Sequence, residues 1–147
     1  MLHDCHQNNF CASLSAESCE YLCQHCSKTM FRKDTKLYNK DLPQQCALIL
    51  DGLLFGTTQS RNGGILPLGL LSKDDFFNAD DLFSSMPGGS QKNEENIAIT
   101  DCSVAIFPHH AIMHIFETFQ QDARFVFSYF MKQTSWCQRY SRGVYLQ

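Results

Sequence analysis

The chain has 147 residues, which is enough for one domain that buries its own hydrophobic core without disulfides or a structural metal. Its formal net charge of −3 argues against nucleic-acid binding by this chain alone, because neutralising phosphates requires a dense basic surface. No apolar run approaches the ~20 residues that a membrane span needs, and the polar opening MLHDCHQNNF is unlike a secretory signal. We therefore expect a cytoplasmic protein with mostly reduced thiols and no contact with a membrane.

The first part of the chain predicts an arm followed by a helix. Residues 1–13 have no periodic pattern, so we expect a loose N-terminal arm. Ser15 can cap a helix that has Glu17 in its first turn. Side chains that suit a buried stripe then recur at i, i+3, i+4 and i+7, namely Cys19, Leu22, Cys23 and Cys26.

These cysteines have two alternative roles. Their spacing, C-x3-C-x2-C, is used by some iron–sulfur proteins. Cysteine also packs as a small hydrophobic residue, and Leu22 completes the same stripe, which favours a core role for the cysteines of the helix. Cys5 and Cys11 lie outside the predicted helix with His3 and His6 beside them, and they are the better candidates for ligands.

Residues 30–107 predict a meander of short strands. Apolar runs alternate with turn signals, of which the sharpest are Asp51-Gly52 and the NGG sequence at residues 62–64. Both supply glycine for a positive φ at little steric cost. We expect a short helix at residues 78–86, a polar loop at residues 90–96, and one long strand at residues 97–107 that closes the sheet.

Two helices are predicted after the last strand. Pro108 ends that strand and stands at the start of a helix through Thr118. Asp122 is expected to cap a second, longer helix. One stripe of this helix has the heptad spacings 4, 3, 4, 3 and 4, and it comprises Val126, Phe130, Gln133, Cys137, Tyr140 and Val144. We expect the first turns to pack on the parent sheet and the later turns to pair with a second subunit in a homodimer.

The order of these elements resembles the sensor domain of Crp/Fnr-type bacterial transcription regulators. The likeness covers roughly residues 14–145, and its most specific segments are residues 33–38 (KDTKLY), 50–52 (LDG), 63–69 (GGILPLG) and 100–102 (TDC). The resemblance implies a mainly β fold, a double-stranded β-helix (jelly roll) of the cyclic-nucleotide-binding type. It divides the chain into an arm (1–13), a sensor roll with flanking helices (14–121) and a dimerisation helix (122–147).

The resemblance also implies a function. Such regulators bind a small-molecule effector on the roll and bind DNA through a helix-turn-helix domain that follows the dimerisation helix. The chain has no room for that second domain. We therefore expect a homodimeric effector sensor that is not an enzyme and that contacts DNA only through a domain not present in this chain.

The resemblance places the ligand pocket after the central hairpin. In members that bind cyclic AMP, a glutamate there binds the ribose, and a downstream arginine binds the phosphate with both arms of its guanidinium. The matching positions here contain Asn78-Ala79 and Lys92-Asn93. The candidate pocket residues are Asp75, Phe77, Asn78, Ala79, Lys92 and Asn93. Because the glutamate and arginine are missing and the loop is acidic, we expect an uncharged or cationic effector rather than a cyclic nucleotide.

Two alternatives stay open. The oxygen-sensing branch of the family holds an iron–sulfur cluster through cysteines of the N-terminal arm and one on a late strand. The candidate ligands would be Cys5, Cys11, Cys19 and Cys23, although the late-strand position contains Ala105. The second alternative is a cupin-like metal enzyme, but the dense histidines His109, His110 and His114 fall on a predicted helix rather than on facing strands. No cofactor is expected in the favoured interpretation.

Overall fold

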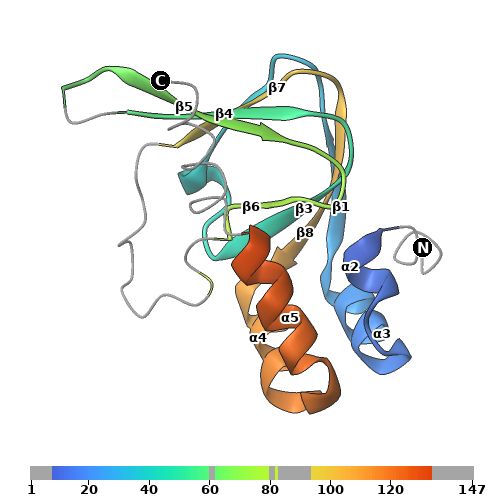
Figure 1. Ribbon diagram of the computed structural model, residues 1–147. Helices are drawn as coiled ribbons and strands as arrows, with labels where there is room; N and C mark the ends of the chain where they lie inside the picture. The colour runs from blue at the N-terminus through green and yellow to red at the C-terminus, as the bar shows by residue number, and fades with distance from the viewer. Residues whose placement is uncertain (1–7, 60–61, 80–81, 83–93, 134–147) are drawn as a thin grey trace.

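The computed structural model describes residues 8–59, 62–79, 82 and 94–133. Figure 1 shows strands stacked in layers, with the helices gathered at one end. In chain order the elements are α2 (Asn9–Ala12), α3 (Ala16–His25), β1 (Ser27–Phe31), β2 (Lys36–Tyr38), the 3-10 helix η1 (Asn39–Asp41), β3 (Gln45–Asp51), β4 (Leu54–Gln59), β5 (Ile65–Leu71), β6 (Phe76–Phe77), β7 (Glu95–Ala98), β8 (Cys102–Pro108), α4 (His109–Thr118) and α5 (Gln120–Gln133).

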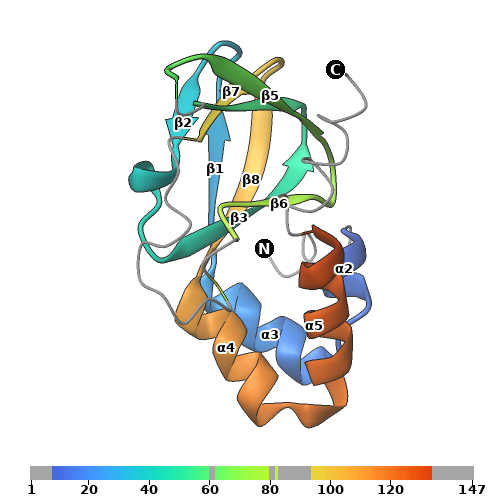
Figure 2. The same ribbon diagram turned by 60° about the vertical axis from the view of Figure 1, so that its left-hand side comes forward.

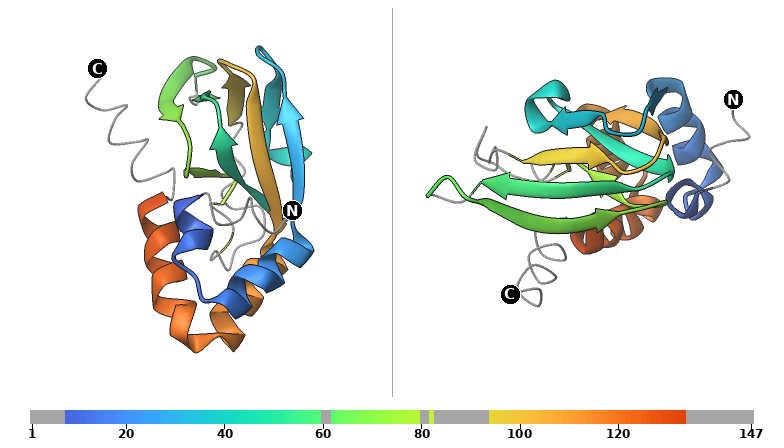
Figure 3. Two further views of the ribbon diagram at one scale, coloured as in Figure 1. Left: turned by 90° about the vertical axis from the view of Figure 1, so that its right-hand side faces the viewer. Right: turned by 90° about the horizontal axis from the view of Figure 1, so that it is seen from above.

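The strands form two antiparallel sheets that face each other. The first sheet has the order β1-β8-β3-β6, and the second has the order β2-β7-β4-β5. Figures 2 and 3 show the helices together at one end of the roll. Their buried side chains share one core with residues of β3, β6 and β8 in the first sheet. The part of the first sheet around β3 is therefore a middle layer covered on both faces, whereas Met30 of β1 is 72% exposed.

Strand β3 shows how the sequence produces this middle layer. Its side chains alternate between two cores: Cys46 and Leu48 face the helices, whereas Ala47 and Ile49 face the second sheet. All four are 0% exposed. A strand covered on both faces needs apolar residues at consecutive positions, which explains the unbroken run CALI in a β protein.

Part of the predicted N-terminal arm is helical. Residues 9–12 form α2, and the Asn8 side chain caps it by accepting a hydrogen bond from the Cys11 amide at 2.7 Å. Phe10 is 0% exposed, and its ring centroid lies 5.0 Å from those of both Phe76 and Tyr129. The expectation of a loose arm was therefore wrong for this part of the chain, because tertiary contacts of one phenylalanine hold a helix too short to be stable alone.

The predicted last strand is two strands. β7 ends at Ala98, and β8 begins at Cys102 after a turn whose Thr100 hydroxyl accepts a hydrogen bond from the Leu53 amide at 3.1 Å. This turn presses against the β3–β4 turn at Gly52. A Cβ atom on Gly52 would lie 2.5 Å from the Asp101 carbonyl oxygen, and its φ of 107° also favours glycine.

The first boundaries of α3 and α4 agree with the sequence, whereas the helix predicted at residues 78–86 is not seen at Asn78, Ala79 and Leu82, and its other residues lie outside the described ranges. α3 begins after its N-cap Ser15, and α4 begins after Pro108, as predicted. α5 begins before Asp122, at Gln120, so the carboxylate does not cap its own helix. Of the helices in the described part of the chain, none is long and apolar enough to cross a membrane.

Asp122 instead connects α5 to the start of α3. Its carboxylate accepts hydrogen bonds from the Ser15 hydroxyl at 2.6 Å, from the Ser15 amide at 3.1 Å and from the Ser18 hydroxyl. Burial disfavours the charged carboxylate, but the hydrogen bonds from the two serines outweigh it and hold the pKa of Asp122 below its ordinary value.

Candidate functional site

The predicted pocket residues lie at one edge of the roll, where they hold the chain in place. The Asp75 side chain accepts a hydrogen bond from the Ser72 amide at 2.8 Å, which closes the β5–β6 turn. Phe77 is 2% exposed in the core between the sheets. Ala79 is 3% exposed in the core beneath the helices.

Asn78 also has a structural role. Its side-chain amide donates hydrogen bonds to the backbone carbonyls of Leu42 and Gln45, each at 2.7 Å, and its φ is 61°. Asparagine tolerates this left-handed backbone better than most residues. The structure thus brings Asp75, Phe77, Asn78 and Ala79 together, but none of them offers a positive charge to a phosphate. Lys92 and Asn93 lie outside the described residues.

Asp74, in the same β5–β6 turn, joins the roll to two helices. Its φ is 75°, and its amide donates to the Ile49 carbonyl at 2.9 Å. Its carboxylate accepts a hydrogen bond from the Asn9 amide of α2 at 2.9 Å, and its carbonyl accepts one from the Tyr129 hydroxyl of α5 at 2.5 Å. Burial, followed by the charges of Asp74 and Asp75, raises the pKa of Tyr129. The sequence marks this turn, but nothing in it identifies the distant partners.

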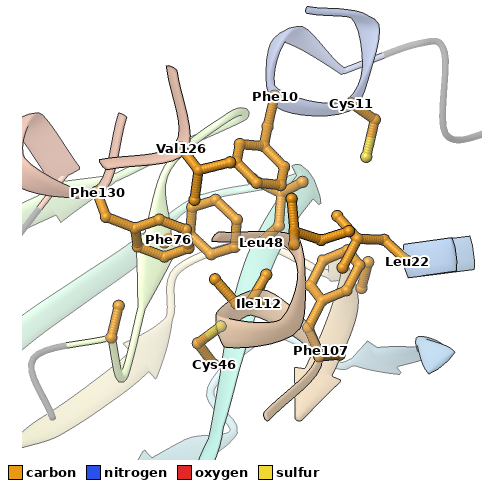
Figure 4. Packing of buried hydrophobic residues seen from close by; sticks show 14 of the residues in the cluster. Phe10, Cys11, Leu22, Cys46, Leu48, Phe76, Phe107, Ile112, Val126 and Phe130 are labelled. Atoms are coloured by element: carbon orange, nitrogen blue, oxygen red, sulfur yellow. The ribbon is translucent and has the colours of Figure 1, made fainter. Parts of the chain in front are cut away.

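An aromatic cluster surrounds this junction. The ring centroid of Phe76 lies 4.4 Å from that of Phe130 and 5.9 Å from that of Tyr129, and Phe10 lies 5.8 Å from Phe130. Figure 4 shows Phe10, Phe76 and Phe130 converging from α2, β6 and α5. The residue that follows the turn is therefore packed directly against α5.

α5 has a buried face and an exposed apolar face. Val126 and Phe130 are 0% exposed in the core beneath the sheet, as expected for the first turns of the predicted heptad stripe. They have no surface left for a partner. Phe127 and Met131, four residues apart, are instead 44% and 46% exposed. Gln133 ends the described helix, and the other residues of the predicted stripe, Cys137, Tyr140 and Val144, lie outside the described residues.

The N-terminal cysteines are poorly suited to ligate a cluster. Cys11 and Cys19 are 2% and 3% exposed, and their thiols are hydrogen-bonded to each other. Burial raises the pKa of Cys11 to about 12, whereas a metal ligand must be a thiolate. Cys23 is disulfide-bonded, and Cys5 lies outside the described residues. Within the described ranges, no group of three or more histidine, cysteine or acidic side chains is arranged to hold a metal ion.

The histidines link two helices. The Tyr21 ring of α3 stacks against His25 at 4.2 Å and against His114 of α4 at 4.3 Å between centroids. His109, His110 and His114 all lie on α4, and the cupin interpretation requires histidines that face one another across strands. This arrangement gives no support to a cupin-like metal centre.

The Thr58 side chain was not singled out by the sequence. Its hydroxyl is buried without a hydrogen-bond partner, and it is the one such side-chain atom among the residues that the structure describes. Thr58 lies on β4 in the second sheet, near the buried polar residue Asn96 of β7. The alternation of residues along β4 could have indicated its inward direction, but not its missing partner.

Comparison with known proteins identifies the fold. No protein-family model matches the sequence, and no curated protein matches it. A c-di-GMP-responsive global regulator of Xanthomonas campestris is 17% identical, with a TM-score of 0.68 over 88% of this chain and 61% of that chain. A Crp/Fnr-family putative transcriptional regulator of Eubacterium rectale is 19% identical, with a TM-score of 0.70 over 96% of this chain and 62% of that chain.

A cyclic nucleotide-binding domain of Methylobacillus flagellatus is 15% identical, with a TM-score of 0.72 over 99% of this chain and 82% of that chain. This chain spans about three fifths of the length of the two regulators. The predicted jelly roll is confirmed. The chain has the β-roll fold that cyclic nucleotide-binding domains share with Crp/Fnr-family regulators.

Proposed function

We propose that the chain is the effector-sensing and dimerising part of a Crp/Fnr-like transcription regulator, with no catalytic activity of its own. The proteins with a similar structure are regulators or regulatory domains. In this proposal, contact with DNA belongs to a part of the regulator outside this chain. The observation that carries the proposal is the attachment of α5 to the roll at Asp74 and Phe76, which leaves another face of α5 exposed.

This attachment gives a route for a signal. A ligand that moves the β5–β6 turn also moves the Asp74 carbonyl and the Phe76 ring, both of which contact α5. Close-packed aromatic side chains transmit displacement rather than absorb it. The same turn binds the first amide of α2 through the Asp74 carboxylate, so α2 and α5 respond together.

The exposed face of α5 supports dimerisation. Phe127 and Met131 lie on one side of the helix, and the ring of Phe127 is 6.1 Å from that of Phe116 on α4. Exposed apolar side chains that form a stripe on a helix are typical of a helix that pairs with another. Tyr140 and Val144 belong to the other stripe, that of Val126 and Phe130, and in this proposal they contact the partner beyond the described residues.

Sedimentation analysis tests the dimer. We expect Phe127→Glu combined with Met131→Glu to give monomers, because two charges would be buried in the apolar contact. Ser128→Glu, on the same turn and also exposed, is the matched control and should leave the dimer intact. Tyr140→Glu combined with Val144→Glu should act as the Phe127 and Met131 pair does. A dimer unchanged in both double variants would contradict the proposal.

The effector in this proposal is uncharged or cationic. The positions at which cyclic AMP-binding members hold a glutamate and an arginine do not supply either group here. Asn78 uses its amide to bind two backbone carbonyls, and Ala79 is buried. The neighbouring turn contributes carboxylates at Asp74 and Asp75, which oppose an anion.

Calorimetry tests this part separately. Titration with cyclic AMP, cyclic GMP or c-di-GMP should give no heat of binding beyond dilution, measured on dimeric protein near neutral pH. The expected outcome follows from the missing phosphate partners. Micromolar affinity for any of these nucleotides would show that the phosphate is recognised by other groups and that this view of the effector is wrong.

A further inference from the structure

Strand β1 leaves one edge of the first sheet open. It stands at the end of the strand order β1-β8-β3-β6, so it pairs with β8 on one side, and no strand of the described residues pairs with its other side. The left view of Figure 3 shows β1 at the margin of the roll. An open edge presents backbone donors and acceptors that can pair with an added strand.

The pairing with β8 divides the side chains of β1 between two faces. Thr29 lies opposite Val104, which belongs to the core between the sheets. Lys28 and Met30 alternate with Thr29 and therefore face away from that core. Met30 is 72% exposed, and Arg32, at the next alternate position, is also exposed. The outer face of β1 thus presents an apolar side chain between two cations.

The charge along this edge is strongly positive, although the whole chain has a net charge of −3. Residues 28–40 contain five basic side chains and one acid, Asp34. The basic residues are all exposed, namely Lys28, Arg32, Lys33, Lys36 and Lys40. Lysine alone is enough to protect an open edge from aggregation. The exposed methionine between two of the cations adds an adaptable apolar contact, which protection does not require.

A second copy of the same edge is a poor partner for β1. Antiparallel pairing of two β1 strands about Met30 would place Lys28 of each copy opposite Arg32 of the other. Like charges directly opposite each other destabilise a sheet, whereas opposite charges stabilise it. The charges therefore favour an acidic strand at this edge.

We propose that the β1 edge binds an extended acidic segment of another protein by strand addition. Side chains directly opposite each other in a sheet lie on the same face. The segment therefore carries acidic residues opposite Lys28 and Arg32 and an apolar residue opposite Met30. Its two acids are separated by about 13 Å along the strand, and the apolar residue lies midway between them. The expected pattern is acid-x-apolar-x-acid, in which x is any residue that suits a strand.

Fluorescence anisotropy with labelled peptides tests the pattern. The probe contains Glu-Val-Leu-Val-Glu with both ends blocked, and the control peptide has the same composition with the two glutamates adjacent. We expect wild type to bind the probe about fivefold or more tightly than the control, because adjacent acids do not reach both cations on one face. Equal binding of the two peptides, or binding of neither, would overturn the proposal.

A methylated probe tests whether a strand is added. N-methylation of the Val-Leu-Val residues keeps both carboxylates but blocks the backbone donors on both edges of the peptide. We expect this probe to bind about tenfold more weakly, because main-chain hydrogen bonds supply much of the affinity in strand addition. Unchanged affinity would mean that charge alone holds the peptide and would overturn strand addition.

Variants of the exposed edge test the cations. Lys28→Glu combined with Arg32→Glu should weaken binding of the acidic probe by about tenfold or more and should allow binding of a Lys-Val-Leu-Val-Lys probe. Lys73→Glu combined with Lys132→Glu changes the net charge equally, at exposed positions outside the β1 edge, and should bind as wild type does. Equal losses in the two double variants would show a dependence on net charge alone and would contradict the proposal.

Competition with duplex DNA separates an acidic peptide from a nucleic acid. Unlabelled peptide should displace the labelled probe at near-physiological salt, whereas DNA at the same concentration of negative charge should not. Displacement by DNA at a lower concentration than by peptide would identify a nucleic-acid surface and overturn the proposal. The result is independent of the dimer and of the effector, so failure at the β1 edge would leave the proposed function intact.

Discussion

Tyr129→Phe isolates the contact between the roll and α5. The substitution keeps the ring in the aromatic cluster and removes the hydroxyl that donates to the Asp74 carbonyl at 2.5 Å. One hydrogen bond contributes about 0.5–1.5 kcal/mol, and a carbonyl left without its partner adds to the loss. We expect the free energy of unfolding to fall by about 1–2 kcal/mol, which lowers the midpoint of thermal unfolding by roughly 3–6 °C in a domain of this size.

Urea unfolding followed by circular dichroism measures this loss. Tyr38→Phe is the control, because Tyr38 is 38% exposed and its hydroxyl binds Glu95 at the surface. The control should lower the free energy of unfolding much less than Tyr129→Phe does, because water replaces the lost contact at the surface. A thermal unfolding midpoint of Tyr129→Phe within about 1 °C of wild type would refute the view that this hydroxyl fastens α5 to the roll.

The pH dependence of the same pair has a definite sign. The pKa of Tyr129 is raised in the folded state, so folding favours the neutral phenol. The stability that Tyr129 contributes is complete below the pKa of an unfolded tyrosine, about 10, and is lost as the pH rises through the folded value. The difference between wild type and Tyr129→Phe should therefore be constant near neutrality and should shrink above about pH 10.

Asp74 binds α2 and α5 through different atoms, so the two contacts can be tested separately. Asp74→Ala removes the acceptor of the Asn9 amide but leaves the carbonyl that binds Tyr129. We expect faster amide exchange in α2 and a near-additive effect with Tyr129→Phe, since the two bonds use different atoms. Asp74→Asn keeps an acceptor and tolerates the φ of 75°, and it should resemble wild type. A large coupling energy between Asp74→Ala and Tyr129→Phe would contradict this view and would mean that either substitution disrupts the whole turn.

Three further substitutions can be tested by urea unfolding. Gly52→Ala should lower the free energy of unfolding by ~1–3 kcal/mol more than Gly63→Ala does. Both glycines have a positive φ, but only a Cβ atom at position 52 would lie against Asp101. Equal losses of stability would contradict the close approach. Phe10→Ala should destabilise the protein by about 3–5 kcal/mol, and a loss below ~1 kcal/mol would mean that α2 is dispensable. Asp122→Asn should lower the free energy of unfolding at neutral pH. Because the pKa of Asp122 is lowered in the folded state, the difference in stability between the variant and wild type should shrink below about pH 4. A difference that stays unchanged there would show that the charge of the carboxylate does not stabilise the fold.

Local signals in the sequence predicted most of the roll. The turns at Gly52 and Gly63, the Ser15 cap and the boundary at Pro108 all depend on residues close in sequence, and each lies where it was expected. The apolar run at residues 46–49 was predicted as a strand, and the structure shows in addition that it is buried on both faces. Pattern and turn chemistry are sufficient wherever the determining contacts are short in range.

Long-range contacts account for what the sequence did not predict. α2 depends on Phe10 reaching β6 and α5, and Asp122 binds serines more than 100 residues earlier in the chain. Neither contact has a local signature. The ligand role of residues 75–79 came from resemblance, whereas their hydrogen bonds show them closing turns. Whether a polar side chain supports the fold or meets a ligand depends on its partners in space.

Ile49 is the point at which the inside of the roll meets the helices. Its side chain lies in the core between the sheets, while its backbone binds both Asp74 and Asp75 at 2.9 Å. Asp74 in turn holds α2 and α5. In the proposed function, this chain of contacts is the route by which a ligand in the roll would reach α5. Each step on this route is a packed or hydrogen-bonded contact, so a displacement at the turn is passed on to α5 rather than absorbed.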